Sequence, residues 1–280
     1  VRLPSAIAGI VTVIGTYFLV RELFRSNRLS LITSFLLAIS PWHIQFSRIA
    51  FEANIGVMIN IWGVYLFLKG IKENRFLYLS AFLFGLGLYA YHSERIFLPL
   101  LVLVLVVLFR KELLKRRRDV LIATGIGFIT IAPLILTFLN PATLSRFRGT
   151  SSFADQTPLL SRSVAKLEED QRSGNPWGAV FDNRRLVWAN TVLEGYLSHF
   201  SLRWLFLTGD NPRHHAPDMG LLYLVELPFV LWGLYSLVTS WNQRSSKLIL
   251  IWFVIAPIAA APTTGLPHAI RTLVFLPTFQ

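Results

Sequence analysis

The sequence predicts an all-α fold: a polytopic bundle of transmembrane helices with one long loop outside the membrane. Of the 280 residues, 54% are hydrophobic and only 15% are charged, whereas an ordinary soluble domain is roughly 25% charged. The apolar residues come in blocks separated by short basic clusters, which is typical of polytopic membrane proteins. Between residues 140 and 218 the hydropathy falls, and the apolar spacing there indicates amphipathic helices at the membrane interface.

Charge and cysteine content exclude other classes of protein. The net charge of +12 is compatible with nucleic-acid binding, but the basic residues lie in the gaps between apolar blocks, where they set membrane topology. We therefore expect no nucleic-acid partner. The absence of cysteine excludes disulfide scaffolds, thiolate metal sites and cysteine nucleophiles. Because the chain begins with Val1 and ends inside an apolar run, we expect it to be part of a longer protein.

Residues 1–139 are expected to form an N-terminal membrane bundle of about six helices. Several of the apolar runs are shorter than the roughly 20 residues that a bilayer requires, so their polar flanks must extend the helices. Pro41 disfavours helical geometry at Ser40, and the second helix should break or bend there. The predicted helices cover residues 6–20, 29–39, 55–68, 76–91, 96–109 and 120–139.

The rest of the chain divides into two parts. Residues 140–218 are expected to form an extracytoplasmic loop with amphipathic helices near 167–171 and 185–199, whose aromatic and arginine residues suit the headgroup level. Residues 219–280 are expected to hold the C-terminal membrane helices. These cover 219–237 and 248–261, and a ninth, truncated helix begins at 272–279.

The basic clusters predict the orientation of the helices. Most of the Lys and Arg residues of the short gaps lie in residues 21–28, 69–75, 110–119 and 241–247. By the positive-inside rule these gaps are cytoplasmic. The polar segments between the other helix ends then share the outer face, and all six histidines fall in them. These segments are residues 40–54, 92–95, 140–218 and 262–271.

The outer segments therefore hold the candidate site, and the stretch SPWHIQFSRIAFEAN at 40–54 forms one wall of it. Ionisable residues at the mouth of membrane helices are costly and need partners. Arg and His there suit a phosphate or pyrophosphate headgroup, and carboxylates suit metal binding or general-base chemistry. Glu52 is the candidate catalytic residue, and metal binding by its carboxylate is left open. The candidate substrate-binding residues are His43, Arg48, His92, Glu94, Arg95, Asp210, Arg213, His214, His215, Glu226, His268 and Arg271.

Structural alternatives remain open for several of these residues. Arg48 and Glu52 are four positions apart and could form a simple helix ion pair. The pair His214–His215 could belong to a solvated loop, and His43, beside a tryptophan, could be an interface residue.

Five stretches together resemble the bacterial family 39-type glycosyltransferases, relatives of the protein O-mannosyltransferases and of the lipid A aminoarabinose transferases. The stretches are RLPSAIAG, SPWHIQFSRIAFEAN, GLYAYHSERIFLPLL, FLTGDNPRHHAPDMGLLYLVELPF and PHAIRTLVFLP. The resemblance implies the C-type glycosyltransferase fold, with its active site on the outer face. It also implies transfer of a sugar from a polyprenyl-phosphate carrier to an acceptor.

The resemblance also implies roles for particular residues. The family's catalytic base is an acidic residue between its first two helices, and RLPSAIAG looks like the start of the second. The base is then expected upstream of Val1, and a fragment lacking it would be inactive. Glu52 matches a second acidic position of the family, where Asp is common. Because Glu replaces Asp here, the resemblance leaves open whether the protein binds a divalent metal as a cofactor. Polar positions where the lipid phosphate would sit are matched by Arg95, Arg213, His214, His215, His268 and Arg271.

The expected protein is thus a multi-pass glycosyltransferase of the inner (plasma) membrane, transferring a hexosyl or pentosyl group with inversion to a hydroxyl or amine. Its acceptor would be a protein, lipid or glycan of the cell envelope, as in protein glycosylation or lipopolysaccharide modification. The rival hypothesis is a flippase or transporter of a lipid-linked sugar. A transporter needs ionisable residues along a path through the membrane, and Glu226 is the one deep carboxylate.

Overall fold

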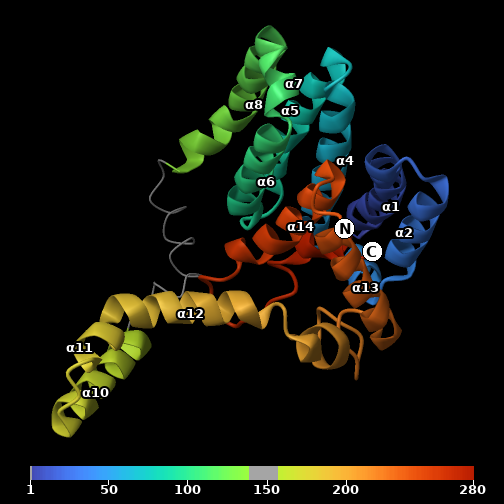
Figure 1. Ribbon diagram of the computed structural model, residues 1–280. Coiled ribbons are helices and arrows are strands. Elements are labelled where there is room, and N and C mark those ends of the chain that lie inside the picture. Colours follow the sequence, from blue (N-terminus) through green and yellow to red (C-terminus); the bar gives the residue numbers. More distant parts are fainter. Residues whose placement is uncertain (1, 139–156) are drawn as a thin grey trace.

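The computed structural model describes residues 2–138 and 157–280, and within these ranges the fold is built of helices with no β-strand. Five helices lie side by side in the order α2 (Asn27–Ile39), α1 (Leu3–Phe24), α4 (Glu52–Gly70), α5 (Asn74–Ala90) and α8 (Arg117–Phe138) (Figure 1). Helix α6 (Glu94–Leu108) packs against α5 on one side and α14 (Arg244–Ile255) on the other. The all-α prediction is confirmed.

Three of these helices, α1, α4 and α8, are long and apolar enough to cross a bilayer. Helix α2 and the short α3 (Pro41–Arg48) together pass the same test as one span bent by 57°. The helices also extend beyond their apolar runs, as predicted: α1 covers Leu3–Phe24, where the apolar run covers 6–20. Polar flanks therefore supply the missing length.

The helix break at Pro41 is confirmed, and within the polar segment 40–54 the chain forms the helix α3 and the start of α4. Proline suits the first turn of a helix, where its missing N–H is not needed, and α3 begins at Pro41. Trp42 and Phe46 are fully buried on the inner side of α3. Apolar burial therefore turns this polar-looking stretch into a helix that packs against the bundle.

Small and polar residues take part in the contacts between helices beside the buried apolar core, and many other large apolar side chains point outward. The Ser80 hydroxyl of α5 donates to the carbonyl of Gly63 in α4 at 2.8 Å. The Trp62 indole of α4 donates to the Val11 carbonyl in α1 at 3.0 Å. Close contacts through small residues and interhelical hydrogen bonds are typical of helix packing in membranes, where apolar burial gives no advantage. In contrast, outward-facing side chains such as Leu121 are largely exposed.

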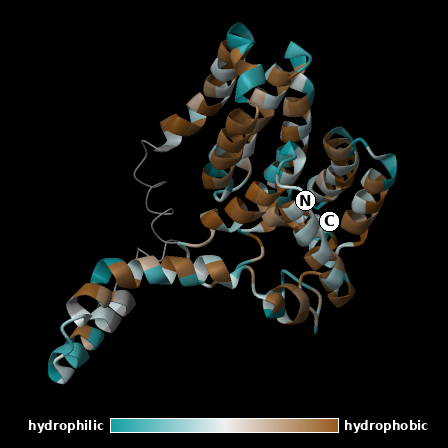
Figure 2. Ribbon diagram, viewed as in Figure 1, coloured by the Kyte–Doolittle hydropathy of each residue, from teal (hydrophilic) through white to brown (hydrophobic). Residues whose placement is uncertain are grey.

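The four basic gaps meet at one end of the bundle, as the charge pattern predicts. Lys72 pairs with Glu22 at 3.2 Å, and the Arg116 guanidinium donates to the Lys72 carbonyl at 2.8 Å. Arg244 pairs with Glu112 at 2.6 Å, which joins the last gap to the third. Hydrophilic residues mark this end of α4, α8 and the short α7 (Arg110–Leu114) in Figure 2. Four gaps far apart in sequence thus share one end.

The described part of the long loop forms an arm of three helices (Figure 1): α10 (Thr157–Ser173), α11 (Gly178–Phe181) and α12 (Arg184–Ser198). Both amphipathic helices predicted there are confirmed. The C-terminal end of α12 rests on the bundle, where the Tyr196 hydroxyl donates to the Val254 carbonyl at 2.8 Å. The beginning of the predicted loop, up to residue 156, lies outside the described residues.

The C-terminal part differs from the prediction in two places. The helix predicted over 219–237 begins later, with a 3-10 turn at Leu224–Glu226 followed by α13 (Leu227–Thr239). Residues before it make other backbone hydrogen bonds: the backbone N–H of Trp42 donates to the Leu221 carbonyl at 3.0 Å, and the N–H groups of Leu221 and Leu222 donate to the Leu205 carbonyl. The last apolar run forms a 3-10 helix, Leu273–Thr278, around the fully buried Phe275. The helix predicted at 248–261 corresponds to α14, which ends at Ile255. A 3-10 turn, Ala256–Ala259, follows it directly.

Candidate functional site

The end of the bundle opposite the basic gaps begins with a polar clamp on the start of α1. The Ser5 hydroxyl donates to the carbonyls of Phe46 and Ile49, both at 3.0 Å. The Asn54 amide donates to the Ser5 carbonyl at 2.9 Å. These bonds fix the bend between α3 and α4, and with it the position of Glu52.

The loop at residues 209–218 packs against this bend. The Gln45 amide of α3 donates to the Arg213 carbonyl at 3.0 Å. The His214 ring lies 5.6 Å from the Phe46 ring and 5.9 Å from the Phe51 ring. The loop is therefore held directly beside the start of α4, although 160 or so positions separate them in the sequence.

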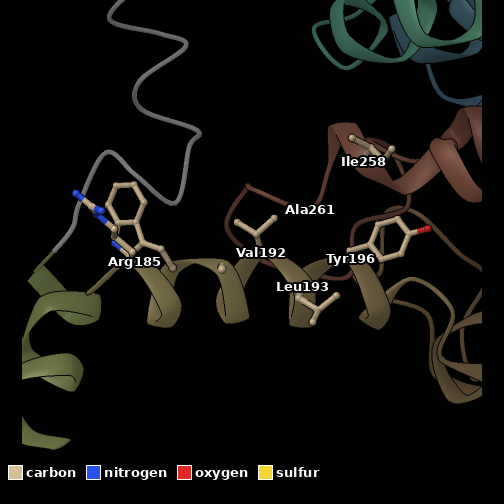
Figure 3. Close-up of a pocket in the computed structure, with 8 residues that line it drawn as sticks. Arg185, Val192, Leu193, Tyr196, Ile258 and Ala261 are labelled. Carbon is tan, nitrogen blue, oxygen red and sulfur yellow. The ribbon is translucent and has the colours of Figure 1, made fainter. Parts of the chain in front are cut away.

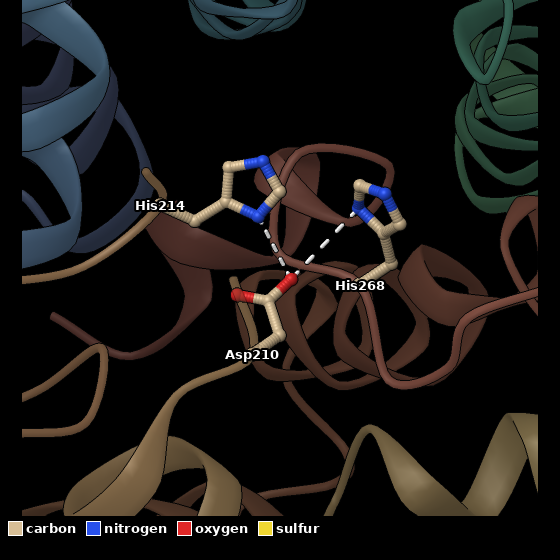
Figure 4. Close-up of side chains that lie close together, drawn as sticks. All are labelled: Asp210, His214 and His268. Atoms are coloured by element: carbon tan, nitrogen blue, oxygen red, sulfur yellow. Dashed lines mark hydrogen bonds and ion pairs between the residues drawn. The ribbon is translucent and has the colours of Figure 1, made fainter. Parts of the chain in front are cut away.

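Asp210, His214 and His268 form a compact cluster between this loop and the turn at 262–271 (Figure 4). The Oδ2 atom of Asp210 lies 2.9 Å from His214 Nδ1 and 3.9 Å from His268 Nδ1, and it accepts the Ala269 N–H at 2.8 Å. One ligand-type atom from each of the three side chains lies within 4.8 Å of the others. Asp210 Oδ1 and His268 Nδ1 are buried and have no hydrogen-bond partner among the described residues.

The cluster presents a carboxylate beside neutral imidazole. Burial alone would raise the pKa of Asp210, but hydrogen bonds from His214 and the Ala269 N–H outweigh burial and lower the pKa overall. Burial, together with the positive charge of Arg271, lowers the pKa of His268 to about 4. At neutral pH, His268 is therefore uncharged and its ring nitrogens can bind a cation.

Arg271 connects this turn to the segment between α5 and α6. Its guanidinium donates to the Thr263 hydroxyl and the Thr264 carbonyl, each at 2.6 Å. Electrostatic interactions join Tyr91 to both Arg271 and Glu52. Arg271 thus lies between the loop cluster and the start of α4.

His92 lies in the same region. Burial lowers its pKa, and the positive charges of Arg271 and Arg95 lower it further. A neutral His92 between two guanidinium groups leaves this part of the site strongly positive. Electrostatic interactions thus relate Glu52 and Arg271 through Tyr91, and Arg271 and Arg95 through His92, beside the 209–215 loop; we call these residues the polar network.

Three candidates lie apart from this network. Glu94 is 1% exposed and lies between α6 and α4, where the Asn60 amide donates to both carboxylate oxygens at 3.1 and 3.0 Å. His43 is buried inside α3, and its Nε2 has no partner among the described residues. Glu226 ends a 3-10 turn before α13, and no contact described joins it to the cluster. The sequence indicated His43 and Glu94 because neighbouring positions are polar, and Glu226 because it is an ionisable residue within an apolar run.

The structure also resolves the alternatives left open. Arg48 ends α3 and Glu52 begins α4, so they do not share a helix, and no ion pair joins them within the described part of the chain. His214 is buried against Asp210, whereas the His215 Nδ1 bonds the neighbouring Ala216 carbonyl at 2.8 Å. The solvated-loop interpretation is therefore wrong for His214. Arg213, between Asp210 and His214 in the sequence, keeps an exposed side chain.

Sequence reasoning missed His199, the residue that supports the cluster from α12. Its Nδ1–H donates to the Gly195 carbonyl at 2.8 Å, and its Nε2 accepts the backbone N–H of His268 at 3.2 Å. Burial lowers the pKa of His199 to about 4, even though its backbone hydrogen bonds oppose this. The partner is 69 positions away, and no local pattern indicates it.

An apolar groove of about 650 Å³ runs along α12 beside the segment 256–261 (Figure 3). Val192 and Tyr196 point from α12 into this groove, with Ile258 opposite and Arg185 at its far end. Glu52, Arg95 and Arg213 line none of the best-defined cavities of the described residues. The groove along α12 is therefore separate from these three residues of the polar network.

Comparisons with known proteins agree with this architecture. Residues 1–136 match the sequence family described as dolichyl-phosphate-mannose-protein mannosyltransferase. The fold is similar to that of the oligosaccharyltransferase of Archaeoglobus fulgidus, solved with a tethered acceptor peptide containing the NVT sequon, with a TM-score of 0.52 and 13% identity. The alignment covers 99% of this chain, which spans 37% of that protein. A comparison with curated proteins gives no match.

Proposed function

We propose that this chain is a C-type membrane glycosyltransferase and forms the donor site of an enzyme that takes a sugar from a polyprenyl-phosphate carrier. The family match over residues 1–136 and the similar fold support this. The observation that supports this most is the network at the end opposite the basic gaps. There Arg271 donates to the Thr263 hydroxyl and the Thr264 carbonyl and interacts electrostatically with Tyr91, and Arg95 interacts electrostatically with His92. Guanidinium groups bind phosphate oxygens in forked geometry, and this positive surface suits the phosphate of such a donor.

In the proposed reaction, an acceptor hydroxyl or amine attacks the anomeric carbon of the sugar. The bond from that carbon to the phosphate oxygen breaks, and the electron pair leaves with the phosphate. Attack from the opposite face inverts the anomeric centre. Arg271 and Arg95 would stabilise the charge that develops on the departing phosphate. A general base would take the proton from the acceptor.

Glu52 would orient the donor from the first turn of α4. Its side chain is exposed, and electrostatic interaction joins it to Tyr91. The apolar groove along α12 would hold the isoprenoid chain, because it begins at Tyr196, one turn before the His199 that supports the site. The acceptor would be a protein, lipid or glycan on the extracytoplasmic side of the plasma membrane.

The test is transfer of labelled sugar from a polyprenyl-phosphate donor by the full-length protein in proteoliposomes. Arg271→Ala removes the positive charge between the loops and should lower kcat/KM roughly 100-fold, the scale of losing one donor to a developing oxyanion. Glu52→Gln should also lower it. The matched control is Arg75→Ala, which removes an exposed arginine paired with Glu73 at the basic end and should leave transfer unchanged.

Equal rates for Arg271→Ala and wild type would refute the assignment of the phosphate site. Translocation of a fluorescent lipid-linked sugar across the membrane without any transfer would support the rival flippase function instead.

A further inference from the structure

We propose that Asp210, His214 and His268 form a binding site for a transition-metal ion, of which Zn²⁺ is the best-suited common example. The three side chains come from two segments that are far apart in sequence, and the fold brings them together in the loop region beside α12. Two imidazoles and one carboxylate are the ligand set found in many zinc sites that keep an open coordination position.

The spacing of the donor atoms fits such an ion. Tetrahedral zinc with ligands at about 2.1 Å places neighbouring ligand atoms roughly 3.4 Å apart. Here Asp210 Oδ2 lies 2.9 Å from His214 Nδ1 and 3.9 Å from His268 Nδ1, and the set lies within 4.8 Å. Small side-chain rotations would therefore equalise the three distances. Nitrogen ligands favour zinc and its first-row neighbours over Mg²⁺ or Ca²⁺.

Buried atoms without partners point to a missing ligand. Asp210 Oδ1 and His268 Nδ1 are both buried and make no hydrogen bond among the described residues, and a buried polar atom left unpaired is costly. The side chain of Asp210 is 10% exposed and that of His214 is 9% exposed. A cation between these side chains would satisfy His268 Nδ1, and it would also satisfy Asp210 Oδ1 when the carboxylate binds through both oxygens.

The surroundings hold the ligands in place, as outer-shell groups do in metal sites. The Ala269 N–H fixes the Asp210 carboxylate at 2.8 Å. His199 accepts the backbone N–H of His268 at 3.2 Å and so positions that residue. The Phe46 and Phe51 rings cover His214. Arg271 is drawn toward Thr263 and Thr264.

A metal here would join the 209–218 loop to the turn at 262–271. If the proposed function holds, the open coordination position would face the same region as the donor phosphate. A role of the metal beside the donor phosphate rests on the proposed function, whereas metal binding itself does not. The metal site and the proposed function can therefore be tested separately.

The test measures binding of Zn²⁺ alone to the purified full-length protein, by metal analysis after dialysis and by isothermal titration. Wild type should retain one Zn²⁺ per chain, and Zn²⁺ should raise Tm. His268→Gln and Asp210→Asn should each weaken Zn²⁺ binding at least tenfold and abolish the rise in Tm. The matched control is His215→Gln, because His215 bonds only its neighbouring carbonyl among the described residues; this variant should bind Zn²⁺ like wild type.

The Tm of each variant without metal serves as the folding control, and two different ligand substitutions guard against one that misfolds. Unchanged Zn²⁺ binding in His268→Gln and Asp210→Asn would overturn the proposal, as would an equal loss in His215→Gln. Loss of binding confined to the ligand variants would support it, whatever the result of the sugar-transfer assay.

Discussion

Replacing Asn60 by Leu tests whether Glu94 is a structural residue of the helix interface. The Asn60 amide donates to both oxygens of the buried Glu94 carboxylate, at 3.1 and 3.0 Å. Leucine keeps the volume of asparagine but donates no hydrogen bond, so the carboxyl group would stay buried without this partner. A hydrogen bond contributes about 0.5–1.5 kcal/mol to stability, and leaving a buried polar group unpaired costs about 1–3 kcal/mol.

We therefore expect Asn60→Leu to lower the free energy of unfolding by about 2 kcal/mol or more. For a chain of this size, that corresponds to a fall in Tm of roughly 4–8 °C. The assay is thermal unfolding in detergent, followed by the fluorescence of the eight tryptophans.

The variant Glu94→Gln tests the same contact from the side of Glu94. A glutamine amide could donate to Asn60 Oδ1, which is buried and has no partner among the described residues, so this variant should be nearly as stable as wild type. Sugar transfer should persist in Glu94→Gln. An unchanged Tm in Asn60→Leu, or loss of transfer without loss of stability in Glu94→Gln, would refute the reasoning.

Three further predictions follow from the described contacts. A side chain at Gly63 would collide with the Phe84 ring, whereas nothing lies within 4 Å of a Cβ atom at Gly125. Gly63→Val should therefore lower the free energy of unfolding by about 1–3 kcal/mol, and Gly125→Ala should not lower it. Thermal unfolding of both variants checks this. Burial and two neighbouring arginines lower the pKa of His92 below 6.5 in the folded state. The unfolded chain therefore takes up more protons as the pH falls below 6.5, so Tm should decline there, and less steeply in His92→Gln; an identical pH profile in both proteins would contradict this. Val192→Trp should fill the groove along α12 and raise KM for a long polyprenyl donor more than for a short one, and equal effects on both donors would show that the chain binds elsewhere.

The sequence was sufficient to predict the helices and the two ends of the bundle. Apolar blocks indicate where helices run, Pro41 marks the bend, and the basic gaps indicate which helix ends lie together. These features depend on residues close to one another in the chain, or on a charge pattern that repeats along it.

The detailed site could not be predicted in the same way. Glu94 looked like an outer-face residue because its sequence neighbours are polar, but its partner Asn60 lies on another helix. The contact of His199 with the His268 N–H, and the grouping of Asp210 with His268, join segments more than 50 positions apart. Such contacts depend on tertiary packing, and one sequence alone carries no signal for them.

The central claim is that the polar network faces the outside of the cell and binds the donor there. Because the chain has no cysteine, single cysteines can be introduced at two exposed positions, Asn211 beside the cluster and Lys115 at the basic end. The measurement is labelling of intact cells with a membrane-impermeant maleimide. We predict that Asn211→Cys is labelled from outside, more slowly when polyprenyl phosphate is added, and that Lys115→Cys is labelled only after permeabilisation. Labelling of Lys115→Cys but not of Asn211→Cys in intact cells would contradict the account.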